Sequence, residues 1–162
     1  YYQALSDGYS CKNAPFEVLE ELLLVKGVTQ EIFDEVGGFL TVYGDGVNIN
    51  TAGEIVLKSL GMDDGLAGKI ISFRAGDDSE IATEDDNAFE DEKNIAVTLQ
   101  SLVVLSNEEI AVLDDLVEQE LIVVRSNFFW GRSLGGFRGA EYVSEIIFIV
   151  GRDERIRYWR EG

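Results

Sequence analysis

The sequence feature that most constrains the fold is a change in residue character near residue 119. Beyond it, β-branched and aromatic residues dominate, and these favour strands over helices. We expect antiparallel strands near residues 120–130, 138–150 and 154–160, arranged as a meander. Glycines supply the two connections, at Gly131, Gly135, Gly136 and Gly139 and then in Gly151–Glu154. Because three strands make only a small sheet, its apolar face needs a helix or another chain to cover it.

Ahead of that change, apolar residues recur at helical spacing between signals that begin and end helices. Pro15 suits the first position of a helix that Gly27 ends. Thr29 can cap a second helix, which Gly37–Gly38 ends. These two segments predict a helical hairpin. Phe39–Tyr43 alternates well enough for a short strand or an extended link.

A second pair of helices follows the first. Gly61 ends the third helix, and Asp63 or Asp64 can cap a fourth that runs to Arg74. Residues 15–75 are therefore predicted to form two tandem helical hairpins. Their expected buried residues are Leu19, Leu22, Leu23, Ile32, Phe33, Leu57, Leu60, Ile70 and Ile71.

One further helix is predicted over residues 106–118, where a capping-box pattern precedes an apolar stripe. The fold class is therefore α+β, with a helical domain over residues 1–118 and antiparallel strands over residues 119–162. The tandem hairpins give the helical domain a SAM-like or helix-hairpin-helix-like character. Within it, residues 76–93 are predicted to form an exposed acidic loop.

Net charge narrows the range of partners. The chain has 31 acidic and 13 basic residues, a formal net charge of −18, so its field repels phosphate backbones and anionic lipid headgroups. The same field attracts divalent cations, since clustered carboxylates repel one another less when they share an ion. The chain has no histidine, which removes the commonest catalytic base and leaves little for zinc.

The acidic loop offers the hard oxygen donors that calcium prefers. Its alternative interpretation, a solvated charged loop, stays open because the spacing is not that of an EF-hand. Backbone carbonyls of Ala82 and Thr83 add further oxygen donors, whereas Asp91 and Glu92 are weaker candidates. The candidate ligands for calcium are Asp77, Asp78, Glu80, Asp85 and Asp86.

The segment Val47–Ala52, continuing to Ile70–Arg74, resembles the helix-hairpin-helix module of competence-type DNA receptors. In such modules, backbone N–H groups at a helix N-terminus bind a phosphate. Here the corresponding turn carries Asp63 and Asp64, whose carboxylates oppose phosphate binding. Nucleic-acid binding is therefore the alternative hypothesis, and a helical hairpin without that ligand is favoured.

A second resemblance covers most of residues 9–162. Pro15–Phe16, Glu20–Thr29 and Leu40–Gly44, leading into Val47–Ala52, look like the general secretion pathway protein K family. The ending is similar as well, with Ser126–Phe129 before a glycine-rich turn and Ile156–Glu161 at the end of the sequence. The order of these motifs is more specific than any one of them.

This resemblance implies a minor pseudopilin of the type II secretion system, a non-enzymatic protein that helps to start assembly of the pseudopilus. A pilin-type sheet, an inserted helical domain that binds calcium, and two other minor pseudopilins as partners at the pseudopilus tip are implied with it. The expected location is the periplasm, with anchoring to the inner membrane through an N-terminal helix in the full-length protein. That helix and the first strand are expected to be absent from this chain.

Enzymatic activity is not predicted. Paired carboxylates can act as the acid and base of a glycosidase, but such pairs need a cleft with converging polar and aromatic side chains. No such pattern is visible, and the tryptophans Trp130 and Trp159 lie in predicted strands, where core or subunit-interface roles are favoured. A hydrolase that uses carboxylates of the acidic loop remains the weakest of the three hypotheses.

Overall fold

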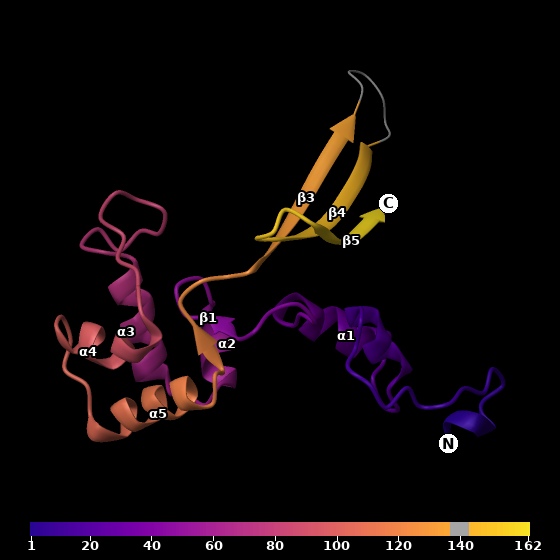
Figure 1. Cartoon of the computed structure of the whole chain (residues 1–162), viewed down its shortest axis with the longest axis horizontal. Coiled ribbons are helices and arrows are strands. Elements are labelled where there is room, and N and C mark those ends of the chain that lie inside the picture. Colours follow the sequence, from indigo (N-terminus) through magenta and orange to yellow (C-terminus); the bar gives the residue numbers. More distant parts are fainter. Residues whose placement is uncertain (137–142) are drawn as a thin grey trace. The chain divides into compact units, whose positions relative to one another are not determined.

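The computed structural model describes residues 1–136 and 143–162 and has an α+β fold, as predicted (Figure 1). The chain divides into two compact units, Tyr1–Val42 and Tyr43–Gly162. The predicted boundary between residues 118 and 119 falls inside the second unit and stays a prediction. Within the described ranges, no helix is long and apolar enough to cross a membrane.

The first unit consists of short helical segments, and none of its residues is fully buried. Its elements are the 3-10 helices η1 Tyr2–Ala4, η2 Leu19–Leu24 and η3 Gly37–Phe39 and the α-helix α1 Gln30–Val36. The helix predicted between Pro15 and Gly27 forms only in part and not as an α-helix, since the 3-10 helix η2 covers Leu19–Leu24 alone.

Thr29 caps α1 as predicted, since its Oγ1 accepts a hydrogen bond from the N–H of Ile32 at 3.3 Å. α1 also ends at Gly37 as predicted. Burial of Ile32 is wrong, however, because this side chain is 44% exposed. The remaining apolar residues predicted to be buried here are only half-buried, namely Leu19, Leu22, Leu23 and Phe33. The unit therefore has an apolar side but no closed core.

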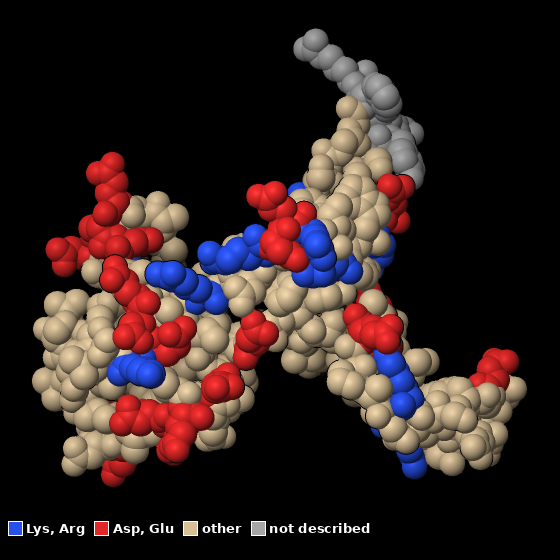
Figure 2. All heavy atoms as spheres, in the orientation of Figure 1, with Lys and Arg blue, Asp and Glu red and all other residues tan. Residues whose placement is uncertain are grey.

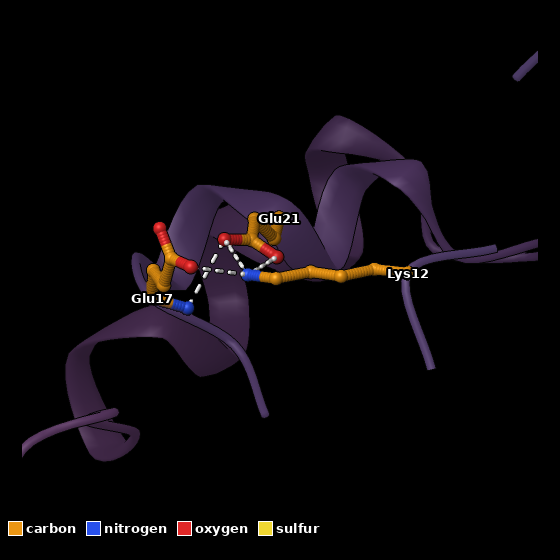
Figure 3. A network of polar contacts seen from close by, with 3 residues as sticks. All are labelled: Lys12, Glu17 and Glu21. Atoms are coloured by element: carbon orange, nitrogen blue, oxygen red, sulfur yellow. Dashed lines mark hydrogen bonds and ion pairs between the residues drawn. The ribbon is translucent and has the colours of Figure 1, made fainter. Parts of the chain in front are cut away.

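A small polar network holds the start of η2 (Figure 3). The Lys12 ammonium lies 3.1 Å from a carboxylate oxygen of Glu17 and 3.1 Å from one of Glu21. The N–H of Glu17 and the ammonium of Lys12 hold the pKa of Glu21 below its ordinary value. Because the network is exposed, it contributes only modestly to stability.

The second unit contains a helical core, which we define as β1, β2 and the helices between them. Its α-helices are α2 Glu54–Ser59, α3 Asp64–Arg74, α4 Ile95–Gln100 and α5 Asn107–Glu118, and η4 Glu92–Asn94 is a 3-10 helix. Side chains from every α-helix meet in its centre. The fully buried ones are Ile49, Leu57, Leu66, Ile70, Ile95, Leu99, Leu113 and Ile122. Predicted burial is thus confirmed for Leu57 and Ile70, whereas Leu60 and Ile71 are half-buried against this cluster.

Side-chain caps define two of these helices as the sequence predicted. The Asp63 carboxylate accepts from the N–H of Leu66 at 2.7 Å and so begins α3. Ser106 and Glu109 form a reciprocal capping box at the start of α5. The Lys69 ammonium reaches the Glu109 carboxylate at 2.5 Å and so joins α3 to α5. α4 was not predicted, because six residues are too few to show a helical period.

The strand predicted over residues 120–130 is wrong as a single element. Its first half, β2 Ile122–Val123, instead pairs in parallel with β1 Val47–Asn48. The N–H of Val47 donates to the carbonyl of Leu121 at 2.8 Å, and the N–H of Ile49 donates to that of Val123 at 2.9 Å. This pairing closes the helical core between its two ends. Residues 39–43 form no strand.

The meander itself is confirmed. β3 Phe128–Gly136, β4 Val143–Gly151 and β5 Ile156–Glu161 pair antiparallel in that order. The turn predicted at Gly151–Glu154 is present, with the N–H of Glu154 bonded to the carbonyl of Gly151 at 2.9 Å. The other predicted connection is wrong in part. Gly131, Gly135 and Gly136 lie inside β3, and Gly139 lies outside the described residues.

Candidate functional site

Asp85 organises the N-terminal half of the acidic loop. Its Oδ2 accepts hydrogen bonds from the N–H groups of Asp77 at 2.6 Å and Asp78 at 3.1 Å. Its Oδ1 accepts from the Thr83 hydroxyl at 2.8 Å. The Thr83 hydroxyl first, and then the N–H of Asp78, hold the pKa of Asp85 below its ordinary value. The loop thus folds back on itself around one carboxylate.

Asp86 and Asp78 complete this arrangement. Asp86 accepts from the N–H of Ala82 at 2.7 Å, and the Thr83 hydroxyl lies 3.3 Å from its other oxygen. Asp78 accepts from the N–H of Glu80 at 2.8 Å. The residues Ser79 and Ala82 take positive φ angles of 63° and 72°, which turns the chain tightly between these bonds.

The five predicted calcium ligands therefore lie in one loop, and their oxygen chemistry suits calcium. Asp78, Asp85 and Asp86 accept hydrogen bonds from the loop itself, and no group of three or more acidic, cysteine or histidine side chains in the described parts of the chain is placed to hold a metal.

The C-terminal end of the acidic loop is packed, which the prediction of an exposed loop missed. Phe89 is 2% exposed and stacks on Phe73 of α3 with ring centroids 4.5 Å apart. The Asn50 side chain bonds to both the carbonyl and the N–H of Phe89, at 2.8 Å each, and to the carbonyl of Val124 at 3.0 Å. Asn87 donates to the carbonyl of Phe73 at 3.0 Å. In the sequence, this packing was indicated only by a single phenylalanine within an acidic segment.

The N-terminus of α3 is the turn that the sequence resemblance compares with the phosphate-binding turn of a helix-hairpin-helix module. Here the Asp63 carboxylate already accepts a hydrogen bond from the N–H of Leu66, in the first turn of the helix. Asp64 adds a second carboxylate and pairs with Lys58 at 2.5 Å. The N–H groups that would meet a phosphate thus lie beside two negative charges.

Acidic side chains are concentrated in the helical part of the chain (Figure 2). Residues 1–118 contain 25 acidic and six basic residues, a net charge of −19. Residues 119–162 contain six acidic and seven basic residues, a net charge of +1. The part of the chain that contains the sheet is therefore nearly neutral, although the protein as a whole is strongly acidic. Charge repulsion from another acidic chain should be weaker at the sheet than at the helical part.

One side of the sheet, which we call the apolar face, collects large hydrophobic side chains. Residues that oppose each other across antiparallel strands share a face. The register therefore places Phe129, Ile146, Phe148, Val150, Ile156 and Trp159 together on it. Phe129 is 47% exposed, Ile156 is 60% and Trp159 is 50%. Among the residues paired in the register of the described strands, Glu161 is the charged residue on this face, and Arg157 lies at the irregularity in β5 without a register partner.

The centre of the apolar face is built around a glycine. The Phe148 ring lies over Gly131, where any Cβ atom would collide with it. Phe148 also stacks on Trp159, with centroids 6.3 Å apart. A side chain at position 131 would force the Phe148 ring to move. Gly131 thus serves a close approach inside β3 rather than a turn.

The opposite side of the sheet is mixed in character. It carries Trp130, which is 63% exposed, and an ion pair between Arg132 and Glu145. The two predicted structural tryptophans thus lie on opposite faces, and neither is buried. Their predicted role in a core is wrong, and the interface role stays a prediction.

Polar contacts hold Ser126 and Asn127, which connect the helical core to β3. The Asn127 amide donates to the Asp45 carboxylate at 2.7 Å, and the Asn48 amide donates to the Ser126 hydroxyl at 2.9 Å. The Arg152 guanidinium reaches the carbonyl of Ser126 at 3.1 Å. These contacts fix where β3 leaves the helical core.

Comparison with known protein-family models, with curated proteins and with solved structures finds no match. Arguments about function therefore rest on the sequence motifs and on the geometry above.

Proposed function

We propose that this chain is a minor pseudopilin of the type II secretion system, of the K type. It acts by assembly with other minor pseudopilins at the tip of the pseudopilus and not by catalysis. The observation that carries the proposal is the exposed apolar face, which follows a self-contained helical core. The ordered sequence motifs that resemble the general secretion pathway protein K family give it its specific form.

An exposed aromatic face on a small sheet is typical of an interface. Phe129, Ile156 and Trp159 are each about half exposed to water. Exposed apolar patches mark interaction sites, and aromatic side chains are the usual anchors of protein interfaces. The part of the chain that contains the sheet also has a net charge close to zero, so an acidic partner meets little net repulsion there. Both features support a role in subunit contacts.

The finer architecture belongs to the same proposal. Under it, α2 and α3 form one hairpin of a SAM-like, helix-hairpin-helix-like helical domain, and α1 belongs to the other. The domain is inserted in a pilin-type sheet, of which β3, β4 and β5 are the last strands. The protein is then located in the periplasm, anchored to the inner membrane by the N-terminal helix of the full-length protein.

Nucleic-acid binding remains the alternative. The carboxylates of Asp63 and Asp64 at α3 and the net charge of −18 argue against it. In a titration with duplex and single-stranded DNA at low salt, we expect no saturable binding. Tight binding that weakens as salt is added would favour the alternative.

Assembly is tested by sedimentation of the chain with soluble domains of partner minor pseudopilins, at about ten micromolar, where weak interfaces are still occupied. We expect a complex that Phe129→Ser combined with Trp159→Ser abolishes. The matched control is Ile55→Ser combined with Val97→Ser, two apolar residues of the helical core that are 60% and 64% exposed. Absence of a complex, or equal loss in both double variants, would contradict the proposal.

We also propose that calcium binds the acidic loop and stabilises the helical core without a catalytic step. The supporting features are the five loop carboxylates and the family resemblance. At free calcium about 100 times the dissociation constant, one site adds about 2.7 kcal/mol to the free energy of unfolding. Chelation should then lower the melting temperature, and magnesium should substitute poorly.

Asp85→Ala or Asp86→Ala should remove most of the calcium-dependent shift, whereas Asp114→Ala on α5 should leave it intact. Identical melting of the unmodified protein in calcium and in chelator would favour the solvated-loop interpretation. The hydrogen bonds to Asp85 would then be the whole reason for the loop's shape.

A further inference from the structure

A groove of about 230 Å³ lies on the helical core, between η4 and α4 on one side and α5 on the other. Its floor is apolar and comes from Ile95, Ala96, Leu113 and Val117. The groove is not part of the apolar face, and none of the five candidate calcium ligands lines it.

The rim of the groove is mostly acidic. Glu92, Asp114 and Glu118 contribute carboxylates, and Lys93 contributes the single cation. One oxygen of Glu92 already has a partner, because its Oε1 accepts a hydrogen bond from the N–H of Val124 at 3.1 Å. Asp114 and Glu118 are exposed and form no ion pair with any described residue. They are therefore available to a cation from outside.

The position of these two carboxylates on α5 is unfavourable for the isolated chain. Asp114 and Glu118 are four residues apart, so their charges lie on the same side of the helix and repel each other. Both also lie in the C-terminal half of α5, where the helix dipole favours cations, and the last turn contains no basic residue. A positive charge at the rim would relieve both effects.

We propose that this groove binds a lysine or arginine side chain presented by a segment of a partner protein. The methylene groups of such a side chain match the apolar floor, and its charged end reaches Asp114 and Glu118. A purely apolar side chain would leave both carboxylates facing a dry surface, and an anionic one would be repelled. The inference does not rest on the proposed assembly through the sheet.

The test uses the whole chain and a short acetylated, amidated peptide with a central lysine, compared with the same peptide containing norleucine. Binding is followed through the backbone amide resonances of Ala96, Leu113 and Val117. We expect saturable shifts with the lysine peptide only. Asp114→Asn combined with Glu118→Gln should weaken binding by about three- to tenfold, the effect of two partly exposed ion pairs.

The matched control is Glu108→Gln combined with Asp115→Asn, which removes the same charge from the side of α5 that faces away from the groove. This control should leave the affinity within about twofold. Lys93→Gln should tighten binding, because it removes the only positive charge on the rim. Equal binding of the norleucine peptide, equal loss in both double variants, or weaker binding by Lys93→Gln would each overturn the proposal.

Discussion

The helical core and the sheet contain similar kinds of apolar residues but bury them very differently. In the helical core, side chains such as Leu57, Ile70 and Leu113 have no exposed surface. In β3, β4 and β5, the only residue described as buried is Gly151. Helices surround a common centre, whereas three strands in one layer leave two faces open. Hydrophobic content alone therefore does not decide which part of the chain forms a core.

Because of this difference in burial, we expect stability and association to depend on different regions of the protein. The free energy of unfolding should depend chiefly on the helical core, while the exposed aromatic residues of the sheet should matter most when a partner is present. Substitutions in the two regions test this expectation, and the expected effects on stability decrease in the order given.

The largest effect is expected from Leu57→Ala. Because Leu57 is fully buried, the substitution leaves a cavity and should lower the free energy of unfolding by about 2–5 kcal/mol. Leu60→Ala should cost less, since Leu60 is only half-buried. Urea denaturation followed by far-ultraviolet circular dichroism measures both values. If the two costs are equal, burial in the helical core is not the controlling variable.

A smaller effect is expected from Arg74→Met. Arg74 is 8% exposed, and its guanidinium donates to the carbonyls of Ile49 at 3.2 Å and Ala52 at 2.6 Å. Burial lowers the pKa of this guanidinium, against a smaller opposing effect of Asp86. Methionine keeps the apolar stem but leaves buried carbonyls without a donor, which costs about 1–3 kcal/mol.

The control for Arg74 is Lys58→Met, at an exposed ion pair on α2. It should change the free energy of unfolding by less than about 1 kcal/mol in the same urea experiment. A similar cost for both substitutions would mean that the buried hydrogen bonds of Arg74 add nothing particular.

Acid sensitivity should also belong to the helical core. Lys69 first, and then the N–H of Ser106, hold the pKa of Glu109 below its ordinary value of 4.5. A carboxylate with a lowered folded-state pKa stabilises the protein above its unfolded-state pKa, and this contribution is lost as pH falls through the folded-state pKa. Glu109→Gln should therefore destabilise the protein at pH 7 and flatten the decline of stability below about pH 4.5.

Urea denaturation across that pH range measures the effect of Glu109→Gln. Glu108→Gln is the neighbouring control, because Glu108 forms neither the ion pair nor the capping hydrogen bonds of Glu109. An unchanged slope in Glu109→Gln would show that other carboxylates dominate the acid response.

The smallest effect on stability is expected from Trp159→Ala in the sheet. Trp159 is 50% exposed, and its stacking on Phe148 is worth about 0.5–1 kcal/mol. Its fluorescence should be accessible to acrylamide in the free chain and protected when a partner covers the apolar face. Loss of more than about 2 kcal/mol on substitution would show that the sheet contributes a core of its own.

Local sequence signals determined several elements correctly. Thr29, Asp63 and the pair Ser106 and Glu109 cap the helices that they were expected to begin. The antiparallel meander and its turn at Gly151–Glu154 also followed from residue type. These features depend on hydrogen bonds and backbone preferences within a few residues, which a sequence states directly.

Local sequence signals identified the candidate sites only in part. The acidic loop was identified from its charge, but Phe89 inside it gave the only hint that one end is packed. The groove between α4 and α5 was not foreseen, since α4 is too short to show a period. Its lining combines residues from η4, α4 and α5, and their contact is decided by packing.

Contacts between distant parts of the chain could not be predicted from local sequence signals. The parallel pairing of β1 with β2 ended the expected strand at residues 120–130 and closed the helical core. Burial of Arg74 beneath the carbonyls of Ile49 and Ala52 had no signature in sequence spacing. By itself the sequence determined local conformation, because that depends on neighbours along the chain; burial depends on which neighbours the fold supplies in space.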